Sequence, residues 1–593
     1  MGMRDFNPFG VKSIEVKFNC NNCGHEVISD EIGVPPPNYS ADNHSDSIRD
    51  NDGYAICPNC GKEYEVYVYA GFGGGNVDIE NIEDDDIFEI IEHDEDIYLQ
   101  EPEEEIKPIY TRFRLICLEV KDWYVLKNFK IDFEDGINVL IGENGSGKSS
   151  VIECLALIFG HLYKFFVEED KKAPYIKRYI ISFESADAET GMLHTVQIDN
   201  CKNSEEGFNP IIYIGNKVID IKNNRTLIKN LLPSKIGLYY AGITDRLQEL
   251  SIHFENKYKD KIKKGDSAIL YPLTLPDTRL FLYVKKEHLG VMLMCLLISE
   301  NEEFIKCWKN EIGIDLSTSE IKLVLKKPSW ANDSAEQLWG AHDLARKFIT
   351  LLSENANRKS VSDNNIEITH SGIYLKDEFT RMFKNNIESK VFDIFDFLLF
   401  SDLLDTINIT WKNRQEEYVE LDHLSEGEKQ LVTTMTFRLL WMNQKGFLLF
   451  DEPDTFLHPK WQQQFISNLS KIENNTQIII TTHSPNIVSN IEKKQLIILD
   501  SGEIKQFSFN PYGKTVENIL IDHFSLQSTR NKEVQTAIDK VKLLIEKDEY
   551  DSPECIQIIE YLKKNIDSTD KDLLSINLEI AKKKHFSTHE KNK

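Results

Sequence analysis

The stretch of sequence that decides the fold is Gly142-Glu143-Asn144-Gly145-Ser146-Gly147-Lys148-Ser149-Ser150. It follows an apolar segment at residues 137–141 and opens a longer segment, from Val151 onward, whose apolar residues recur with helical spacing. Glycines in such a loop let backbone N–H groups curve round a phosphate chain, while Lys148 reaches the β- and γ-phosphates. The Ser149 hydroxyl, at the start of the helix, can bind Mg²⁺. The sequence therefore predicts a strand, a phosphate-binding loop (P-loop) and a helix. We predict that residues 142–150 bind ATP.

Two carboxylates end another apolar segment. Residues 447–450 are Phe-Leu-Leu-Phe, and Asp451 and Glu452 follow them directly. In a parallel sheet such a strand ends beside the P-loop, where Asp451 would hold Mg²⁺ and Glu452 would polarise the attacking water. A surface turn also accommodates Asp-Glu-Pro, but four apolar residues before it favour a buried strand. We therefore predict Asp451 and Ser149 as magnesium ligands and Glu452 as the catalytic base.

A third apolar segment, residues 477–482, has the same build and ends at His483. A histidine at the end of such a strand can hydrogen-bond the γ-phosphate, although a lone histidine is more often structural. We include it in the predicted catalytic set, which is Lys148, Glu452 and His483.

The segment Leu424-Ser425-Glu426-Gly427-Glu428 precedes another helix. Locally it is a capping box, in which Ser425 caps the helix and Glu428 reaches back to the cap. A serine and a glycine at a helix N-terminus also form a site for an anion. A motif of this form lies too far from the P-loop of its own chain, so the γ-phosphate must come from a second copy. We therefore predict that Ser425 and Gly427 bind ATP across the interface of a homodimer or higher homo-oligomer.

Four of the ten cysteines form two Cys-x-x-Cys pairs, Cys20 with Cys23 and Cys57 with Cys60. A glycine follows each pair, as in tight turns that bring two thiolates to one tetrahedral metal. We predict a Zn²⁺ site of the zinc-ribbon type. Its role stays open between a structural staple, which is the default, and docking of a partner or of nucleic acid. The other cysteines are scattered, and core packing explains them best.

Length and composition fit a globular protein of several domains. The chain has 593 residues, of which 41% are hydrophobic, and a formal net charge of −28 at pH 7. This charge excludes a protein that coats nucleic acid or an anionic membrane over its whole surface, so any contact with DNA or RNA must be local. We see no signal peptide and no apolar run of the roughly 20 residues that a membrane span needs. The sequence thus predicts a cytoplasmic protein without a membrane partner.

With these motifs in order, residues 113–505 resemble the ABC-type ATPase heads of the SMC, RecF and OLD proteins. The resemblance rests on the P-loop, on Leu-Ser-x-Gly-Glu at 424–428, on Asp-Glu-Pro at 451–453 with Leu-His-Pro at 457–459, and on His483. It implies a Mg²⁺-dependent ATP hydrolase in which two heads sandwich two ATP molecules.

By position, the resemblance assigns Lys148 and Ser149 to one face of the bound nucleotide and Ser425 and Gly427 to the opposite face. It leaves the glutamine of the family's Q-loop unassigned, with Gln197 as a candidate.

Two longer stretches, 237–247 and 280–288, and a tail that begins at Gly513 are similar to Septu-type (PtuA) antiphage defence ATPases and to relatives found beside retrons. This resemblance implies a sensor ATPase that controls a separately encoded nuclease of the HNH type. Retron RNA or DNA, or other DNA, is a further candidate contact. The zinc-ribbon extension departs from the family pattern.

The chain itself is not expected to cut DNA. Its tail after residue 507 has a helical pattern, and we find no HNH-like group of histidines and no pair of acidic strand ends of the Toprim kind. The alternative function is a RecF- or SMC-like repair ATPase that binds DNA directly. The basic segment 257–264 has the aromatic and cationic pattern of a phosphate-tracking surface, and a solvated loop explains it equally well.

The predicted fold class is α/β, an ABC-type P-loop head with an inserted lobe and two extensions. We expect a zinc ribbon at 1–75, an acidic linker at 76–110, a first ATPase lobe at 111–243, an inserted mostly helical lobe at 244–405, a second ATPase lobe at 406–508 and a C-terminal helical region at 509–593. The acidic segment also contains Ile, Phe and Tyr residues, so a strand or short helix is the alternative there. The apolar stripes of the C-terminal helices predict packing on the ATPase or on a partner.

Overall fold

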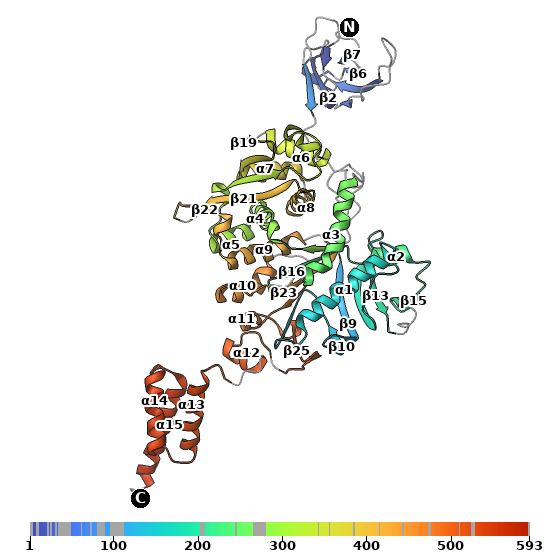
Figure 1. Ribbon diagram of the computed structural model, residues 1–593. Helices are drawn as coiled ribbons and strands as arrows, with labels where there is room; N and C mark the ends of the chain where they lie inside the picture. Colours follow the sequence, from blue (N-terminus) through green and yellow to red (C-terminus); the bar gives the residue numbers. More distant parts are fainter. Residues whose placement is uncertain are drawn as a thin grey trace. The chain divides into compact units, whose positions relative to one another are not determined.

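The computed structural model describes residues 4–6, 11–20, 23, 26–29, 32–33, 49–57, 59–60, 62–71, 74–79, 89–94, 112–201, 208–242, 246–264, 280–341, 343–354, 356–383, 386–413, 415–441, 444–471, 476–508, 510–523 and 528–590. The chain forms two compact units. The first is Met1–Pro102 with Asp377–Asn385, and the second is Glu103–Lys376 with Asn386–Lys593. Each unit has its own sheets (Figure 1).

The first unit is made of antiparallel strands. One sheet has the order β1-β7-β6-β5, with bounds Arg4–Phe6, Gly74–Ile79, Glu63–Gly71 and Arg49–Ile56. In the other, β2 (Val11–Asn19) pairs with β3 (Glu26–Ile28), β4 (Ile32–Gly33) and β8 (Glu89–Asp94). The buried interior of this unit includes Phe18 from β2 and Tyr64 from β6, whose rings meet edge to face with their centroids 4.9 Å apart.

The acidic segment predicted as a linker at 76–110 lies partly in these sheets. β7 continues to Ile79, and β8 pairs antiparallel with β2, where Ile90 stands opposite the buried Val16. The isoleucines of this segment explain the outcome, since a pure solvated tail would offer no apolar residue to a sheet. The linker prediction was therefore wrong for 76–79 and 89–94, and residues 80–88 and 95–110 lie outside the described residues.

A mostly parallel sheet forms the centre of the second unit. Its order is β17-β16-β23-β24-β11-β25-β26, and only β26 runs antiparallel to its neighbour. The bounds are Phe281–Tyr283, Lys235–Tyr240, Gly446–Asp451, Gln477–Thr481, Ile137–Gly142, Leu496–Asp500 and Glu503–Ile504. Every residue of β11, β23 and β24 is buried, as the continuous apolar runs predict.

The helix after the P-loop, α1 (Lys148–Phe166), packs against this sheet and against a second, antiparallel sheet. That sheet has the order β10-β9-β12-β13-β14-β15, with bounds Leu126–Asp132, Phe113–Trp123, Tyr179–Ala186, Leu193–Asp199, Ile211–Ile214 and Lys217–Ile219. The ring of Phe159 on α1 lies 5.8 Å from that of Phe113 and 5.3 Å from that of Phe447 on β23. This apolar contact holds the start of α1 at the carboxyl edge of the parallel sheet.

Among the described residues, α1 is long and apolar enough to cross a membrane. However, 67% of its most apolar 18-residue stretch is buried inside the fold. Its hydrophobic character therefore follows from its place between two sheets.

The inserted lobe is predicted to be mostly helical, with residues 280–283 and 366–374 as exceptions. Strands do occupy 281–283 and 365–371, and the lobe contains further strands that were not expected. β17 belongs to the parallel sheet, and an antiparallel sheet has the order β19-β20-β18-β21-β22, with bounds Arg358–Val361, Asn365–Ser371, Glu320–Lys326, Leu404–Lys412 and Tyr418–Glu420. The predicted boundary at 405 falls inside β21. Helices of the same region are α3 (Arg246–Lys264), α4 (Leu289–Ile298), α5 (Glu302–Glu311), α6 (Asp343–Glu354), α7 (Gly372–Met382) and α8 (Ile387–Phe400). Of the basic segment on α3, the side chains after Lys257 lie outside the described residues, and Lys257 Nζ lies 2.7 Å from Glu168 Oε2.

The second unit contains further helices. They are α2 (Arg225–Leu231), α9 (Glu426–Leu440), α10 (Pro459–Ser470), α11 (Pro485–Val488) and α12 (Val516–His523).

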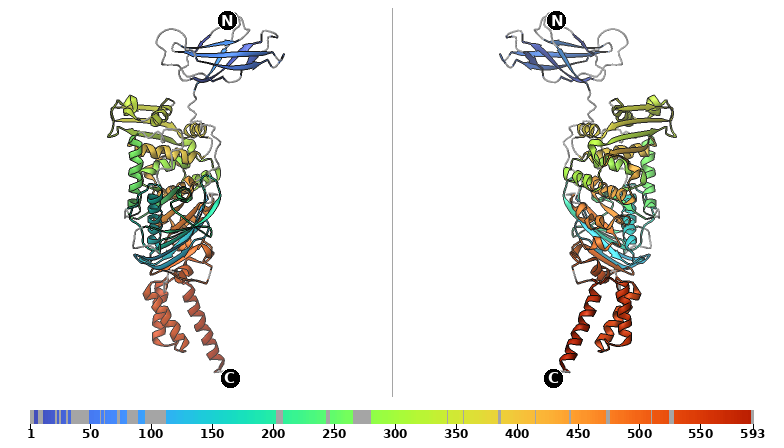
Figure 2. Two further views of the ribbon diagram at one scale, coloured as in Figure 1. Left: turned by 90° about the vertical axis from the view of Figure 1, so that its right-hand side faces the viewer. Right: turned by 90° about the vertical axis from the view of Figure 1, so that its left-hand side faces the viewer.

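The C-terminal helices α13 (Lys532–Glu546), α14 (Pro553–Asn565) and α15 (Lys571–Glu590) pack on one another (Figures 1 and 2). Their shared core contains Ile538, Val541, Cys555, Leu562 and Ile576, each fully buried. The three amphipathic helices thus bury much of their apolar faces against each other. Ile556, Leu574 and Leu578 stay exposed, and the packing of these helices on the ATPase or on a partner stays a prediction.

Candidate functional site

The P-loop connects β11 to α1 at the carboxyl edge of the parallel sheet. Gly142 has φ +154°, and a Cβ there would lie 2.2 Å from the carbonyl oxygen of Leu499 on β25. Only glycine fits so close to a neighbouring strand. Lys148 turns back over the loop, and its Nζ donates to the carbonyl oxygens of Gly142 at 3.0 Å and of Glu143 at 3.1 Å. The loop is therefore already shaped around its lysine.

Two polar groups of the loop fit a bound phosphate. The Ser146 hydroxyl is buried and has no hydrogen-bond partner in the described part of the chain. Burial lowers the pKa of Lys148, while the nearby Glu452 and Asp451 act in the opposite direction. A buried donor and a buried cation are costly unless something pairs with them, and a phosphate oxygen offers that pairing.

Asp451 meets Ser149 and Thr481 where β23 and β24 end. Ser149 Oγ donates to Asp451 Oδ1 at 3.0 Å, and Thr481 Oγ1 donates to the same oxygen. Burial raises the pKa of Asp451, and the two hydroxyl hydrogen bonds act against this rise. A carboxylate and a serine hydroxyl at this distance can share one Mg²⁺, which would also offset the cost of burying the charge.

Glu452 and His483 face each other at the same edge. His483 Nε2 lies 3.7 Å from Glu452 Oε1, and the side chains are 37% and 36% exposed. Glu452 has a left-handed backbone, with φ +53°, and its N–H donates to the carbonyl and the hydroxyl of Thr481, each at 3.1 Å. Such a strained conformation persists only when its surroundings hold it. Here the contact with Thr481 turns the carboxylate towards solvent and His483.

The protonation of His483 follows from its surroundings. Burial, together with the charge of Lys148, lowers the pKa of His483, although Glu452 acts in the opposite direction. The imidazole is therefore neutral at pH 7 and can donate from only one of its nitrogens. We name residues 142–149 with Asp451, Glu452, Thr481 and His483 the P-loop edge.

Ser425 and Gly427 begin α9. Ser425 is the N-cap, and its N–H donates to Glu428 Oε2 at 2.8 Å while its Oγ accepts from the N–H of Glu428 at 3.3 Å, so the predicted capping box is present. A Cβ on Gly427 would lie 2.7 Å from the carbonyl oxygen of Phe456, which follows the Asp451 strand. Gln430 Oε1 accepts from the N–H of Phe456 at 3.0 Å. The start of α9 is thus tied closely to residue 456.

An open hollow of 660 Å³ lies at this helix start, and we name it the signature groove. It is lined by Glu311, Ser425, Glu426, Gly427, Thr455, Phe456, Leu457, His458, Lys460 and Trp461. None of these lining residues belongs to the P-loop. Ser425 is exposed, and so is Phe456, at 55%. Within the described residues of one chain, the two predicted halves of the ATP site therefore stand apart.

Some residues of the site were not predicted. Thr481 was inside the segment that led to His483, but its contact with Asp451 depends on strand register, in which the two residues stand opposite each other. A polar residue at the end of a buried strand is the signal that could have found it. Gln197 lies within β13, opposite Ser182 and Tyr213, and its role stays a prediction.

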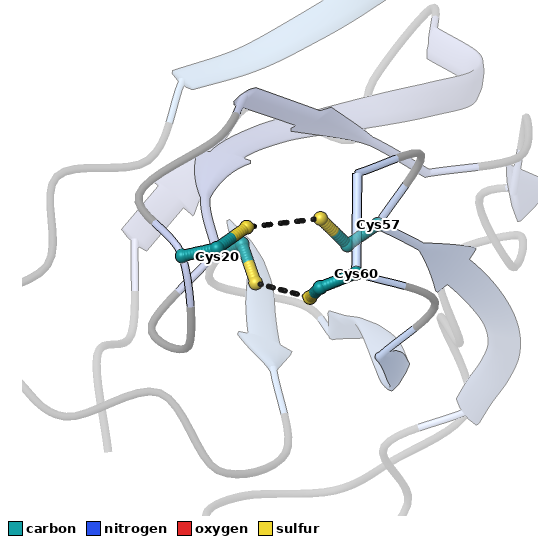
Figure 3. Close-up of side chains that lie close together, drawn as sticks. Cys20, Cys57 and Cys60 are labelled. Atoms are coloured by element: carbon teal, nitrogen blue, oxygen red, sulfur yellow. Dashed lines mark hydrogen bonds between the residues drawn. The ribbon is translucent and has the colours of Figure 1, made fainter.

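The cysteines of the two pairs converge in the first unit (Figure 3). Cys20 Sγ lies 3.6 Å from Cys60 Sγ, and Cys23 Sγ lies 3.6 Å from Cys57 Sγ, with all these atoms within 4.8 Å of one another. Sulfurs bound tetrahedrally to zinc at about 2.3 Å lie about 3.8 Å apart, so this group can hold one metal ion. The Tyr64 hydroxyl donates to Cys20 Sγ at 3.0 Å, a contact that stabilises a thiolate.

The chain is similar to several known proteins. A retron Vc95 probable ATPase of Vibrio cholerae serotype O1 biovar El Tor is 23% identical in an alignment of 502 positions that covers 78% of this chain and 90% of that protein. The Septu protein PtuA of Bacillus thuringiensis is 31% identical in an alignment of 183 positions that covers 27% of this chain and 46% of that protein. Among solved structures, the SMC head domain from Thermotoga maritima aligns with a TM-score of 0.29 at 14% identity, over 67% of this chain and 100% of that domain.

The family described as AAA ATPase domain matches residues 115–488, which is more than half of the 593-residue chain and contains the P-loop, both carboxylates, the signature segment and His483. The chain belongs to this AAA ATPase family.

Proposed function

We propose that this protein is an ABC-type ATPase that pairs with a second copy around ATP and, through that cycle, controls a separately encoded nuclease in antiphage defence. The ATPase part rests on the family and on the P-loop edge. The defence part is supported by relatives named as a retron probable ATPase and as a Septu protein. An HNH-type nuclease is the partner that this likeness favours.

In this proposal the P-loop residues bind the triphosphate. The backbone N–H groups of residues 142–150, the Ser146 hydroxyl and the Lys148 ammonium surround the phosphates at the start of α1. Ser149 and Asp451 would hold Mg²⁺, which supplies charge neutralisation of the phosphate oxygens when bound.

Glu452 and His483 serve hydrolysis. Glu452 is the base that takes a proton from the attacking water, because its carboxylate is turned outward at the strand end and is one-third exposed. His483, neutral at pH 7, donates a hydrogen bond to the γ-phosphate and stands close enough to Glu452 to sense its charge.

The observation that carries the proposal is the separation of the signature groove from the P-loop edge. Ser425, Gly427 and the first N–H groups of α9 form an exposed anion site that the P-loop of the same chain does not line. A second copy brings its own triphosphate to this site, so hydrolysis depends on pairing.

The zinc group of the first unit is proposed as a structural staple. Four sulfurs within 4.8 Å of one another would bind one Zn²⁺ and hold two turns together. Metal analysis of the purified chain should find zinc, and Cys57→Ser should remove it and expose the first unit to protease. A metal-free wild-type chain with an equally protease-resistant first unit would contradict the staple.

The proposal is tested by expressing the tagged chain with its neighbouring genes and challenging the cells with phage. We expect a nuclease to co-purify, and protection to be lost with Lys148→Ala. If no effector co-purifies and cells lacking the gene resist phage equally well, the role in defence is wrong. Hydrolysis that rises with DNA and falls steeply with salt would instead favour the alternative, a RecF- or SMC-like repair ATPase.

A further inference from the structure

The first turn of α10 contacts the signature groove and the segments that follow Glu452 and His483. α10 begins directly after residues 451–458, with Pro459 in its first turn and the His458 ring accepting from the N–H of Lys460 at 3.3 Å. Two adjacent residues of this turn, Trp461 and Gln462, contact different neighbours. Because a helical turn is rigid, a shift of one of these residues moves the other.

The Gln462 side chain hydrogen-bonds to the segments that follow β23 and β24. Its Oε1 accepts from Ser484 Oγ at 2.9 Å and from Asn486 Nδ2 at 3.0 Å, both just after His483. Its Nε2 donates to the carbonyl oxygen of Asp454, just after Glu452, at 3.2 Å. One side chain therefore connects the segment after His483 with the segment after Glu452.

Trp461 joins the signature groove to the inserted lobe. Its ring lies 3.5 Å from the place where a Cβ on Gly427 would stand, and it lines the groove. Its Nε1–H donates to Glu311 Oε2, at the end of α5, at 3.0 Å. Lys460 Nζ lies 3.1 Å from the same oxygen, and the charge and hydrogen bonds of these two partners hold the pKa of Glu311 below its usual value despite burial.

We propose that the first turn of α10 couples the His483 segment to the signature groove, with Gln462 and Trp461 as positioning residues and Glu311 as the point through which the inserted lobe biases the groove. This inference rests on the proposed function, because the signal is the nucleotide in the P-loop. In this scheme γ-phosphate contact at His483 moves Ser484 and Asn486, Gln462 follows, and Trp461 shifts against Gly427. A head that holds ATP thereby presents a groove ready for the second copy.

The first test replaces Gln462 by Met, which keeps the length of the side chain and removes its hydrogen bonds. Gln463→Met is the matched control, since Gln463 is exposed on the same helix. The readout is amide hydrogen exchange of residues 424–430 with a non-hydrolysable ATP analogue, at a protein concentration too low for pairing. We expect the analogue to slow exchange of these residues in the wild type and in the control. In Gln462→Met, the analogue should leave their exchange rate unchanged.

Turnover provides a second readout on the same variants. Gln462→Met should keep KM and nucleotide affinity but lower kcat and the ATP-dependent pairing constant about tenfold, a usual size for coupling between sites. Equal falls in affinity and in kcat would indicate a purely structural role and overturn the proposal. So would unchanged kcat with normal exchange behaviour.

The contribution of Glu311 is tested by a double-mutant cycle with Trp461→Phe, which keeps the ring and removes the N–H donor. Glu311→Gln and Trp461→Phe should each weaken ATP-dependent pairing, and the double variant should be no worse than the stronger single one. The exposed Glu300→Gln serves as control. Additive losses would show that Glu311 and Trp461 act independently and would overturn this part.

The two levels of the account fail differently. If wild type neither binds nor hydrolyses ATP, the proposed function is wrong. If wild type binds, hydrolyses and pairs normally but ATP leaves exchange at 424–430 unchanged, only the coupling is wrong.

Discussion

The P-loop edge and the signature groove are both built at helix N-termini, but their groups are paired within the chain to different degrees. α1 follows β11 of the parallel sheet, and α9 follows β22 of the antiparallel sheet. At the P-loop edge, the Lys148 ammonium and the Asp451 carboxylate already have partners within the chain. In the signature groove, the exposed Ser425 bonds only its own capping box among the described contacts, and Phe456 projects at 55% exposure. This difference supports the proposal that one chain binds the triphosphate and that a second copy is needed to enclose it.

The largest expected effect is on turnover, from Glu452→Gln. Without this base, kcat for ATP hydrolysis should fall about 10²- to 10⁴-fold, while the P-loop edge still binds ATP. The two copies should then accumulate as an ATP-bound pair, detected by light scattering after gel filtration. A variant that hydrolyses ATP at the normal rate would remove Glu452 from its assigned role.

Lys148→Ala should break the P-loop edge alone. Charge-assisted hydrogen bonds worth about 3 kcal/mol are lost, so the Kd for ATP should rise about a hundredfold or beyond measurement. Titration calorimetry checks this, with the exposed Lys217→Ala as control. Tight ATP binding by the Lys148 variant would show that the phosphates lie elsewhere.

Gly427→Ala should break the signature groove alone. Its methyl group would stand 2.7 Å from the Phe456 carbonyl oxygen, so the groove must distort. We expect kcat and pairing to fall about tenfold to a hundredfold, as for other displacements of a reacting group, with ATP affinity unchanged. Equal loss of affinity in dilute protein would erase the distinction between the two regions.

A smaller effect is expected at Asp454, which lies between the two regions. Burial raises the pKa of Asp454 from 3.8 to about 6. The folded protein therefore holds this proton at pH values where the unfolded chain has lost it, and the free energy of unfolding falls as pH rises from about 4 to about 6. The loss is at most about 3 kcal/mol.

Asp454→Asn removes this titration, so its advantage in stability over wild type should appear above pH 4 and level off above pH 6. Urea unfolding of the ATP-free protein at pH 4, 5 and 7 measures the effect. Parallel stabilities of the two proteins across this range would show that the Asp454 carboxyl titrates normally.

The parallel sheet could be predicted from the sequence because the strands ending at Gly142 and Asp451 are short, largely apolar runs. The contact of Thr481 with Asp451 could not, since it depends on strand register. β18, with buried and half-buried residues in alternation, was missed because helical segments surround it. The links of Gln462 and Trp461 join residues far apart in sequence, and no local pattern announces them.

The central claim, that two copies complete each other's ATP site, is tested most directly by mixing two impaired variants. Lys148→Ala keeps an intact signature groove, and Gly427→Ala keeps an intact P-loop edge. In a mixed pair, the P-loop of one variant meets the groove of the other and forms one complete site. The account predicts that the mixture hydrolyses ATP faster than the sum of the two variants measured alone. A mixture that only equals this sum, with an ATP-loaded Glu452→Gln protein that remains a single chain, would contradict it.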